Sequence, residues 1–96
     1  MIMYDPPHPG EFIREVYLET LELSARAVAL KLKVSPSTFA RLINGKSNVT
    51  PEMALRLSKT LGRSAESWLA MQSNYDLWQA RRRIDLGEVE ELELAV

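Results

Sequence analysis

The sequence predicts an all-α domain built from five helices. Apolar residues recur at helical spacing along most of the chain. Serine or threonine stands directly before four of the apolar segments, where its side chain can cap a helix. Glycine follows two of them, at Gly45 and Gly62, where a helix commonly ends. A length of 96 residues is enough for one domain with a single modest core.

Two short helices joined by a tight turn are predicted between Ser24 and Gly45. Ser24 caps the first of them, and Val28, Ala29 and Leu32 would form its inner face. The second helix opens with Ser35-Pro36, a capping residue followed by a proline at the first helical position. Asn44-Gly45 closes it.

The second of these helices has two different faces. Phe39, Leu42 and Ile43 are spaced to share one buried face. Ser37, Thr38 and Arg41 would lie on the opposite side, the last two one turn apart. Short hydroxyls and a guanidinium suit phosphates and base edges. A plain surface helix of a small bundle is the alternative interpretation of the same pattern.

The first ten residues are predicted to form an extended lead-in, because three prolines in four positions disfavour a helix. His8, the only histidine, is interpreted as a packing or capping residue. A helix is expected over residues 11–21. Its inner face would carry Phe12, Ile13, Val16 and Tyr17, with Thr20 as a further candidate.

Two more helices are predicted, over residues 51–61 after the cap Thr50 and over 65–84 after the cap Ser64. In the first of them Leu55 is expected to be partly buried. The last helix has more apolar surface than a small monomer needs, which predicts a protein interface. The interface candidates are Trp68, Met71, Tyr75, Trp78 and Ile84. Residues 85–96 form an acidic tail, either disordered or ordered as a strand or helix by a partner.

Charge is distributed unevenly along the chain. Residues 24–63 carry eight lysines and arginines against one glutamate, a net charge of +7. Residues 1–23 and 64–96 each carry a net charge of −4. A basic block that coincides with the paired short helices is typical of a phosphate-binding face, although clustering by chance can produce one.

The same sequence argues against several classes of protein. It has no cysteine, which excludes disulfides and thiolate metal sites. No catalytic set of Ser/His/Asp or Cys/His type is evident, so we expect neither an enzyme nor a bound cofactor or metal. No membrane span or signal pattern is recognisable, and a cytoplasmic location is expected.

Four segments of the chain form a connected pattern, HPGEF, SPSTFARLINGK, VTPEMALRLSKTLG and SAESWLAMQSNYDLWQAR, which span residues 8–81. Together they resemble the HigA/VapI antitoxin family, and residues 24–45 resemble the helix-turn-helix of Cro/C1-type (XRE) repressors. The resemblance implies a five-helix, lambda-repressor-like DNA-binding domain with a C-terminal dimerisation helix or tail. It also implies a homodimer that binds a palindromic operator in double-stranded DNA, represses its own operon and neutralises a HigB-type ribonuclease toxin.

The resemblance also implies roles for single residues. The recognition-helix positions are Ser35, Pro36, Ser37, Thr38 and Arg41. Asn44 and Lys46 match the loop that meets the DNA backbone, and Ser24 and Arg26 match the start of the preceding helix. Arg63 is a further candidate for phosphate contact.

Two positions depart from the family pattern. Ala25 stands where many members carry glutamine, and Lys33 stands where the turn usually holds glycine. If the turn keeps its geometry, Lys33 adopts a positive φ at a cost on the order of 1 kcal/mol. These departures leave open a helical protein-interaction module that has lost DNA binding. A stand-alone repressor without a toxin is the other alternative.

Overall fold

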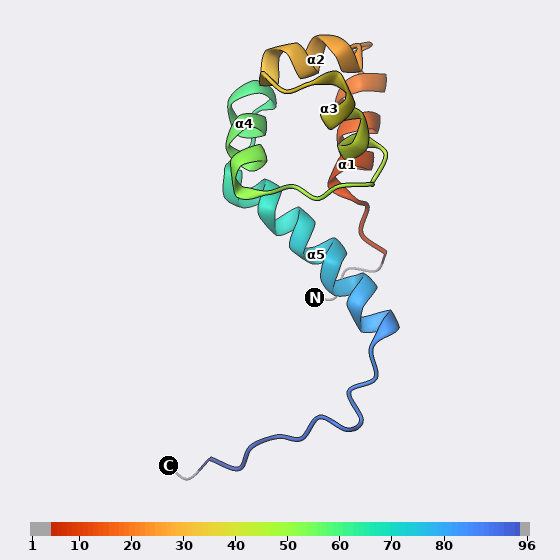
Figure 1. The fold of residues 1–96 in the computed structure, drawn as a ribbon, viewed down its shortest axis with the longest axis vertical. Helices are drawn as coiled ribbons and strands as arrows, with labels where there is room; N and C mark the ends of the chain where they lie inside the picture. Colours follow the sequence, from red (N-terminus) through yellow and green to blue (C-terminus); the bar gives the residue numbers. More distant parts are fainter. Residues whose placement is uncertain (1–4, 95–96) are drawn as a thin grey trace.

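A computed structural model describes residues 5–94, and its elements are all helical within that range (Figure 1). The prediction of five helices is confirmed if α1 and the η1 segment that continues it are taken as one. The elements are α1 (Pro9–Phe12), η1 (Ile13–Glu19), α2 (Ala25–Leu32), α3 (Pro36–Ile43), α4 (Pro51–Leu61) and α5 (Ala65–Arg83). Figure 1 shows α1 to α4 gathered into a bundle, with α5 running away from it.

The four predicted N-terminal caps are present. Each capping hydroxyl accepts a hydrogen bond from the backbone N–H three residues later, which satisfies one of the free donors of the first turn. The hydroxyl-to-nitrogen distances are 3.0 Å at Ser24, 3.1 Å at Ser35, 3.2 Å at Thr50 and 3.0 Å at Ser64. Side chains that are local in sequence therefore set where α2 to α5 begin.

The first helix begins at Pro9, two residues before the predicted start. Its cap is His8, whose Nδ1 accepts a hydrogen bond of 2.9 Å from the Gly10 N–H. Pro9 occupies the first helical position, where a missing N–H does no harm. The predicted extended lead-in over residues 1–10 is therefore two residues too long, and its residues 1–4 lie outside the described part. Burial lowers the pKa of His8, which keeps the ring neutral and Nδ1 free to accept.

Gly10 allows α1 to lie directly against the end of α3. A Cβ atom at this position would stand 1.8 Å from the carbonyl oxygen of Leu42 and 2.8 Å from the Cα of Ile43. No side chain fits such a gap, so glycine is required by the close approach of two backbones.

The η1 segment is a π-helix, in which hydrogen bonds span one residue more than in an α-helix. This wider turn shifts the inner face. Ile13 and Leu18, five residues apart, are buried, whereas Val16 is 42% exposed and Thr20 is exposed. The predicted inner face was wrong at Val16 and Thr20 because it assumed α-helical spacing.

The core joins all of the helices. Its buried side chains include Phe39 and Leu42 from α3, Leu57 from α4 and Trp68 from α5. Trp68 is fully buried and donates its indole N–H to the carbonyl of Gly62 at 2.9 Å. Its assignment to a partner interface is thus corrected: Trp68 anchors α5 to the bundle. Leu55, expected to be partly buried, is 63% exposed.

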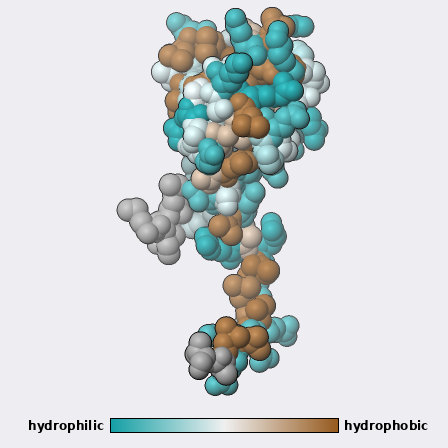
Figure 2. Space-filling model, turned by 90° about the vertical axis from the view of Figure 1, so that its left-hand side faces the viewer, coloured by the Kyte–Doolittle hydropathy of each residue, from teal (hydrophilic) through white to brown (hydrophobic). Residues whose placement is uncertain are grey.

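The second half of α5 leaves the bundle. Met71, Tyr75 and Trp78 are half-buried, while Leu77 and Ile84 are exposed. Beyond Arg83, residues 84–94 carry neither helix nor strand, and Figure 2 shows apolar and polar side chains alternating along this projecting tail. None of the helices within residues 5–94 is long and apolar enough to cross a membrane.

We predict that Gly10→Ala lowers the free energy of unfolding by about 3 kcal/mol, because the added methyl group forces α1 away from Leu42. Urea unfolding measures this change. Gly87→Ala is the matched control, since Gly87 lies in the tail outside the core, and its midpoint should equal that of the wild type. Equal midpoints for the two alanine variants would contradict the packing described above.

Candidate nucleic-acid interface

The turn between α2 and α3 has the left-handed geometry that the resemblance implies. Lys33 has φ 62° and ψ 41°, in the left-handed region. Its N–H donates to Leu30 O at 3.2 Å, and the next N–H, from Val34, donates to Ala29 O at 3.1 Å. Val34 lies half-buried in the corner between the helices.

The outward face of α3 carries a connected group of hydroxyls. The Ser35 Oγ atom lies 2.8 Å from the Thr38 Oγ1 and 3.2 Å from the Ser37 Oγ, and all three residues are exposed. Arg41 follows one turn later and is also exposed. Within residues 5–94 its guanidinium makes no hydrogen bond or ion pair, so its donors are available to a partner. We call Ser35, Ser37, Thr38 and Arg41 the recognition ridge.

The opposite face of α3 fixes the orientation of this ridge. Phe39, Leu42 and Ile43 are buried in the core, as predicted. Because these three side chains hold one side of a short helix, the hydroxyls and the guanidinium must point outward.

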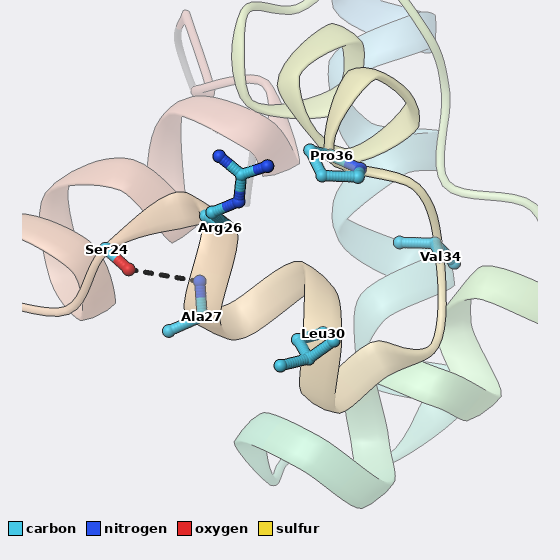
Figure 3. A pocket seen from close by; sticks show the side chains of 6 residues that line it. All are labelled: Ser24, Arg26, Ala27, Leu30, Val34 and Pro36. Atoms are coloured by element: carbon cyan, nitrogen blue, oxygen red, sulfur yellow. Dashed lines mark hydrogen bonds between the residues drawn. The ribbon is translucent and has the colours of Figure 1, made fainter.

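The starts of α2 and α3 border one groove of about 440 Å³ (Figure 3). Ser24 and Arg26 line it from α2, and Pro36 lines it from α3. Figure 3 shows the hydrogen bond between Ser24 and Ala27 that opens α2. Both helix starts carry a partial positive charge and free N–H groups, which together favour an anion such as phosphate. The remaining lining residues are Ala27, Leu30 and Val34.

The loop after α3 is held from both sides. Gln72 of α5 is only 5% exposed, and its Oε1 accepts the Val49 N–H at 2.8 Å. Its Nε2 donates to the Asn48 Oδ1 at 3.3 Å and the Asp76 Oδ1 at 2.9 Å. These contacts fix one end of the loop to α5, while Lys46 stays exposed near its start.

The other end of the loop is held by Arg14. Its Nη2 donates to the carbonyl oxygen of Ile43, the last residue of α3, and to the Oδ1 of Asn44 at 2.8 Å. The guanidinium of Arg14, a residue of η1, thus caps the C-terminal end of α3.

Two arginines of the basic block over residues 24–63 also have partners within the chain. Arg56 donates to the carbonyl of Leu32 at 2.8 Å and caps the end of α2. The Arg63 guanidinium carbon lies 5.2 Å from the ring centroid of Phe12 and 5.8 Å from that of Trp68. Cation–π contacts hold Arg63 against α1 and α5, but the residue is exposed, so its contact with phosphate stays a prediction.

Sequence reasoning missed the supporting residues Arg14, Arg56 and Gln72. The partners that they hold in the loop and at the helix ends lie 23 to 30 residues away in the chain, and periodicity carries no information about such contacts. The position of Gln72 in the sequence could have indicated its structural role. Gln72 is a polar residue one turn after Trp68, which is typical of a buried side chain that serves a backbone group.

The helix-turn-helix family model matches residues 13–68, more than half of the chain. The chain belongs to the helix-turn-helix family. The uncharacterized helix-turn-helix transcriptional regulator YddM of Escherichia coli K12 is 38% identical over 92 residues, which cover 96% of this chain and 97% of YddM.

Solved structures place the chain among the HigA-type members of this family, as the resemblance implies. The antitoxin GraA has a TM-score of 0.86 and 35% identity, covering 94% of this chain and 99% of GraA. The Pseudomonas aeruginosa antitoxin HigA, solved with the higBA promoter, has a TM-score of 0.81 and 33% identity, covering 92% of this chain and 99% of HigA.

For this helix-turn-helix chain we predict that Lys33→Gly raises the free energy of unfolding by about 0.5–1 kcal/mol. Glycine adopts the positive φ of this turn without steric strain, although it gains more freedom when unfolded. Lys31→Gly removes the same charge within α2 and should lower stability by about 1 kcal/mol. Thermal melting of both variants provides the measurement, and a Lys33→Gly protein that melts below the wild type would show that the turn is unstrained.

Proposed function

We propose that this chain is a sequence-specific operator-binding repressor that acts as the antitoxin of a HigBA-type toxin–antitoxin pair. The observation that carries the proposal is the recognition ridge, an exposed set of hydroxyls and one guanidinium without a partner among residues 5–94, on a helix whose other face is core. The likeness to HigA, a protein solved with promoter DNA, supports the same assignment.

Phosphate contacts come from the edges of the ridge. The free N–H groups at the starts of α2 and α3 bind phosphate oxygens, with Arg26 beside them in the groove of Figure 3. Asn44 and Lys46 add contacts from the loop. These interactions position the protein on the duplex and carry no sequence information.

Base recognition comes from the ridge itself. Ser37 and Thr38 are short enough to approach base edges in the major groove, and Arg41 can donate two parallel hydrogen bonds to a guanine. Pro36 sets the start of the helix that presents them. Arg41 is therefore the principal discriminator between operator and other DNA.

A homodimer presents two such helices to a palindromic site, about 34 Å apart. The exposed half of α5 is the dimer surface in this proposal, with the neighbouring tail. Its candidate contacts are Met71, Tyr75, Trp78 and Ile84. The partner neutralised by the antitoxin is a small ribonuclease of HigB type, and the repressed operon encodes both proteins.

We predict that Arg41→Ala lowers the preference for the operator over a duplex with a changed guanine by about 1–3 kcal/mol. Gel shifts with DNA from the protein's own promoter measure this preference. Arg26→Ala is the comparison variant. It should weaken binding to all duplexes alike and reduce the slope of log affinity against log salt by about 1.

An Arg41→Ala protein that distinguishes the duplexes as well as the wild type would remove Arg41 from this role. If the wild-type protein shows no binding to DNA that weakens with added salt, the result would instead favour a helical interaction module without DNA binding.

A further inference from the structure

Arg14 and Asn44 make a contact that the proposed function does not use. Asn44 ends α3 with φ −95° and ψ 7°, and its backbone N–H is bonded to the Ala40 carbonyl at 3.1 Å. The backbone at this position is therefore fixed. What remains free to vary is the orientation of the Asn44 side-chain amide.

The chemistry of Arg14 decides that orientation. A guanidinium has only donors, so the group of Asn44 that faces it must be the acceptor Oδ1. The observed distance from Nη2 to Oδ1 is 2.8 Å. The same nitrogen also donates to the carbonyl of Ile43, so the guanidinium is tied to the helix end as well as to the amide.

The consequence is a directed donor at the surface. With Oδ1 facing Arg14, the Nδ2 of Asn44 points away from it, and within the described chain neither of its N–H groups has an acceptor. Asn44 is exposed, at the end of the recognition ridge and two residues before Lys46. Phosphate oxygens only accept hydrogen bonds, so a phosphate can use Nδ2 but not Oδ1.

The groove beside Arg14 and Asn44 is acidic. Arg14 and Asn44 line a groove of about 350 Å³ together with Glu11 of α1 and with Glu15 and Glu19 of η1. These three carboxylates line the same groove as Arg14, and within residues 5–94 none of them forms an ion pair with its guanidinium. They repel phosphate from this side, which leaves the outer side of Asn44 for DNA.

We propose that Arg14 is a positioning residue for operator binding: it sets the Asn44 amide so that its N–H donors face a DNA phosphate. The inference rests on the proposed function, and it assigns Arg14 no contact with DNA. Loss of Arg14 lets the amide rotate, and loss of Asn44 removes the donor. Removing either residue should therefore cost operator binding the same hydrogen bond, so the two effects should not add.

A double-mutant cycle tests this coupling with the full-length protein and an operator duplex. Asn44→Ala and Arg14→Gln should each weaken binding by about tenfold, the effect of one charge-assisted hydrogen bond. The double variant should also lose about tenfold rather than the hundredfold expected of independent sites.

Asn44→Asp separates positioning from stability. The new carboxylate pairs with Arg14, so the melting temperature should stay at or above that of the wild type. It also places a negative charge where the phosphate binds, so operator affinity should fall further than in Asn44→Ala. The affinity of Asn44→Asp relative to Asn44→Ala can still contradict the inference if Arg14→Gln fails to fold.

Arg56→Gln is the matched control, because Arg56 caps the end of α2 with the same chemistry. Its operator affinity should stay within about twofold of the wild type, and it should show no coupling to Asn44. Losses that multiply in the double variant, or an Asn44→Asp protein that binds as well as Asn44→Ala, would overturn the inference alone. A wild-type protein that does not prefer its operator would overturn the proposed function, and this inference with it.

Discussion

The contact between the first helix and the end of α3 is the constraint on which the rest of the structure depends. Gly10 brings the backbone of α1 against Leu42, and Arg14, one turn further along, donates to Ile43. His8 fixes the start of the same segment through Gly10. A short helix such as α3 is marginal alone, so its stability and direction come from this packing. The recognition ridge is exposed in one orientation because the C-terminal end of α3 is held by these contacts.

Positive charge in this protein has two separate uses. Arg14, Arg56 and Arg63 bind carbonyl groups or aromatic rings of the chain itself. Arg26 and Arg41 make no internal hydrogen bond or ion pair within residues 5–94. Arginine suits both uses, because its planar fork binds carbonyls as readily as phosphates or bases. The net charge of residues 24–63 therefore overstates how many cations the surface offers to a polyanion.

The sequence predicted those parts of the fold that depend on near neighbours. The caps at Ser24, Ser35, Thr50 and Ser64 and the buried face of α3 are local patterns, and the structure confirms them. The π-helical turns of η1 were not predictable in this way, because residue spacing was interpreted with the α-helical period. Trp68 was misassigned for a related reason: its burial depends on which helices meet. The residues of the ridge were located correctly on the surface, whereas Arg14 and Gln72, which support the neighbouring loop, were not.

We propose that the DNA-binding surface consists of the starts of α2 and α3, the recognition ridge and the following loop. NMR titration of the ¹⁵N-labelled protein with an operator duplex tests this most directly. We expect the largest amide shift changes at Ser24–Ala27, Ser35–Arg41 and Asn44–Lys46, and we expect them to diminish as salt is added. Largest changes in the second half of α5 or in the tail, with the ridge unaffected, would contradict it.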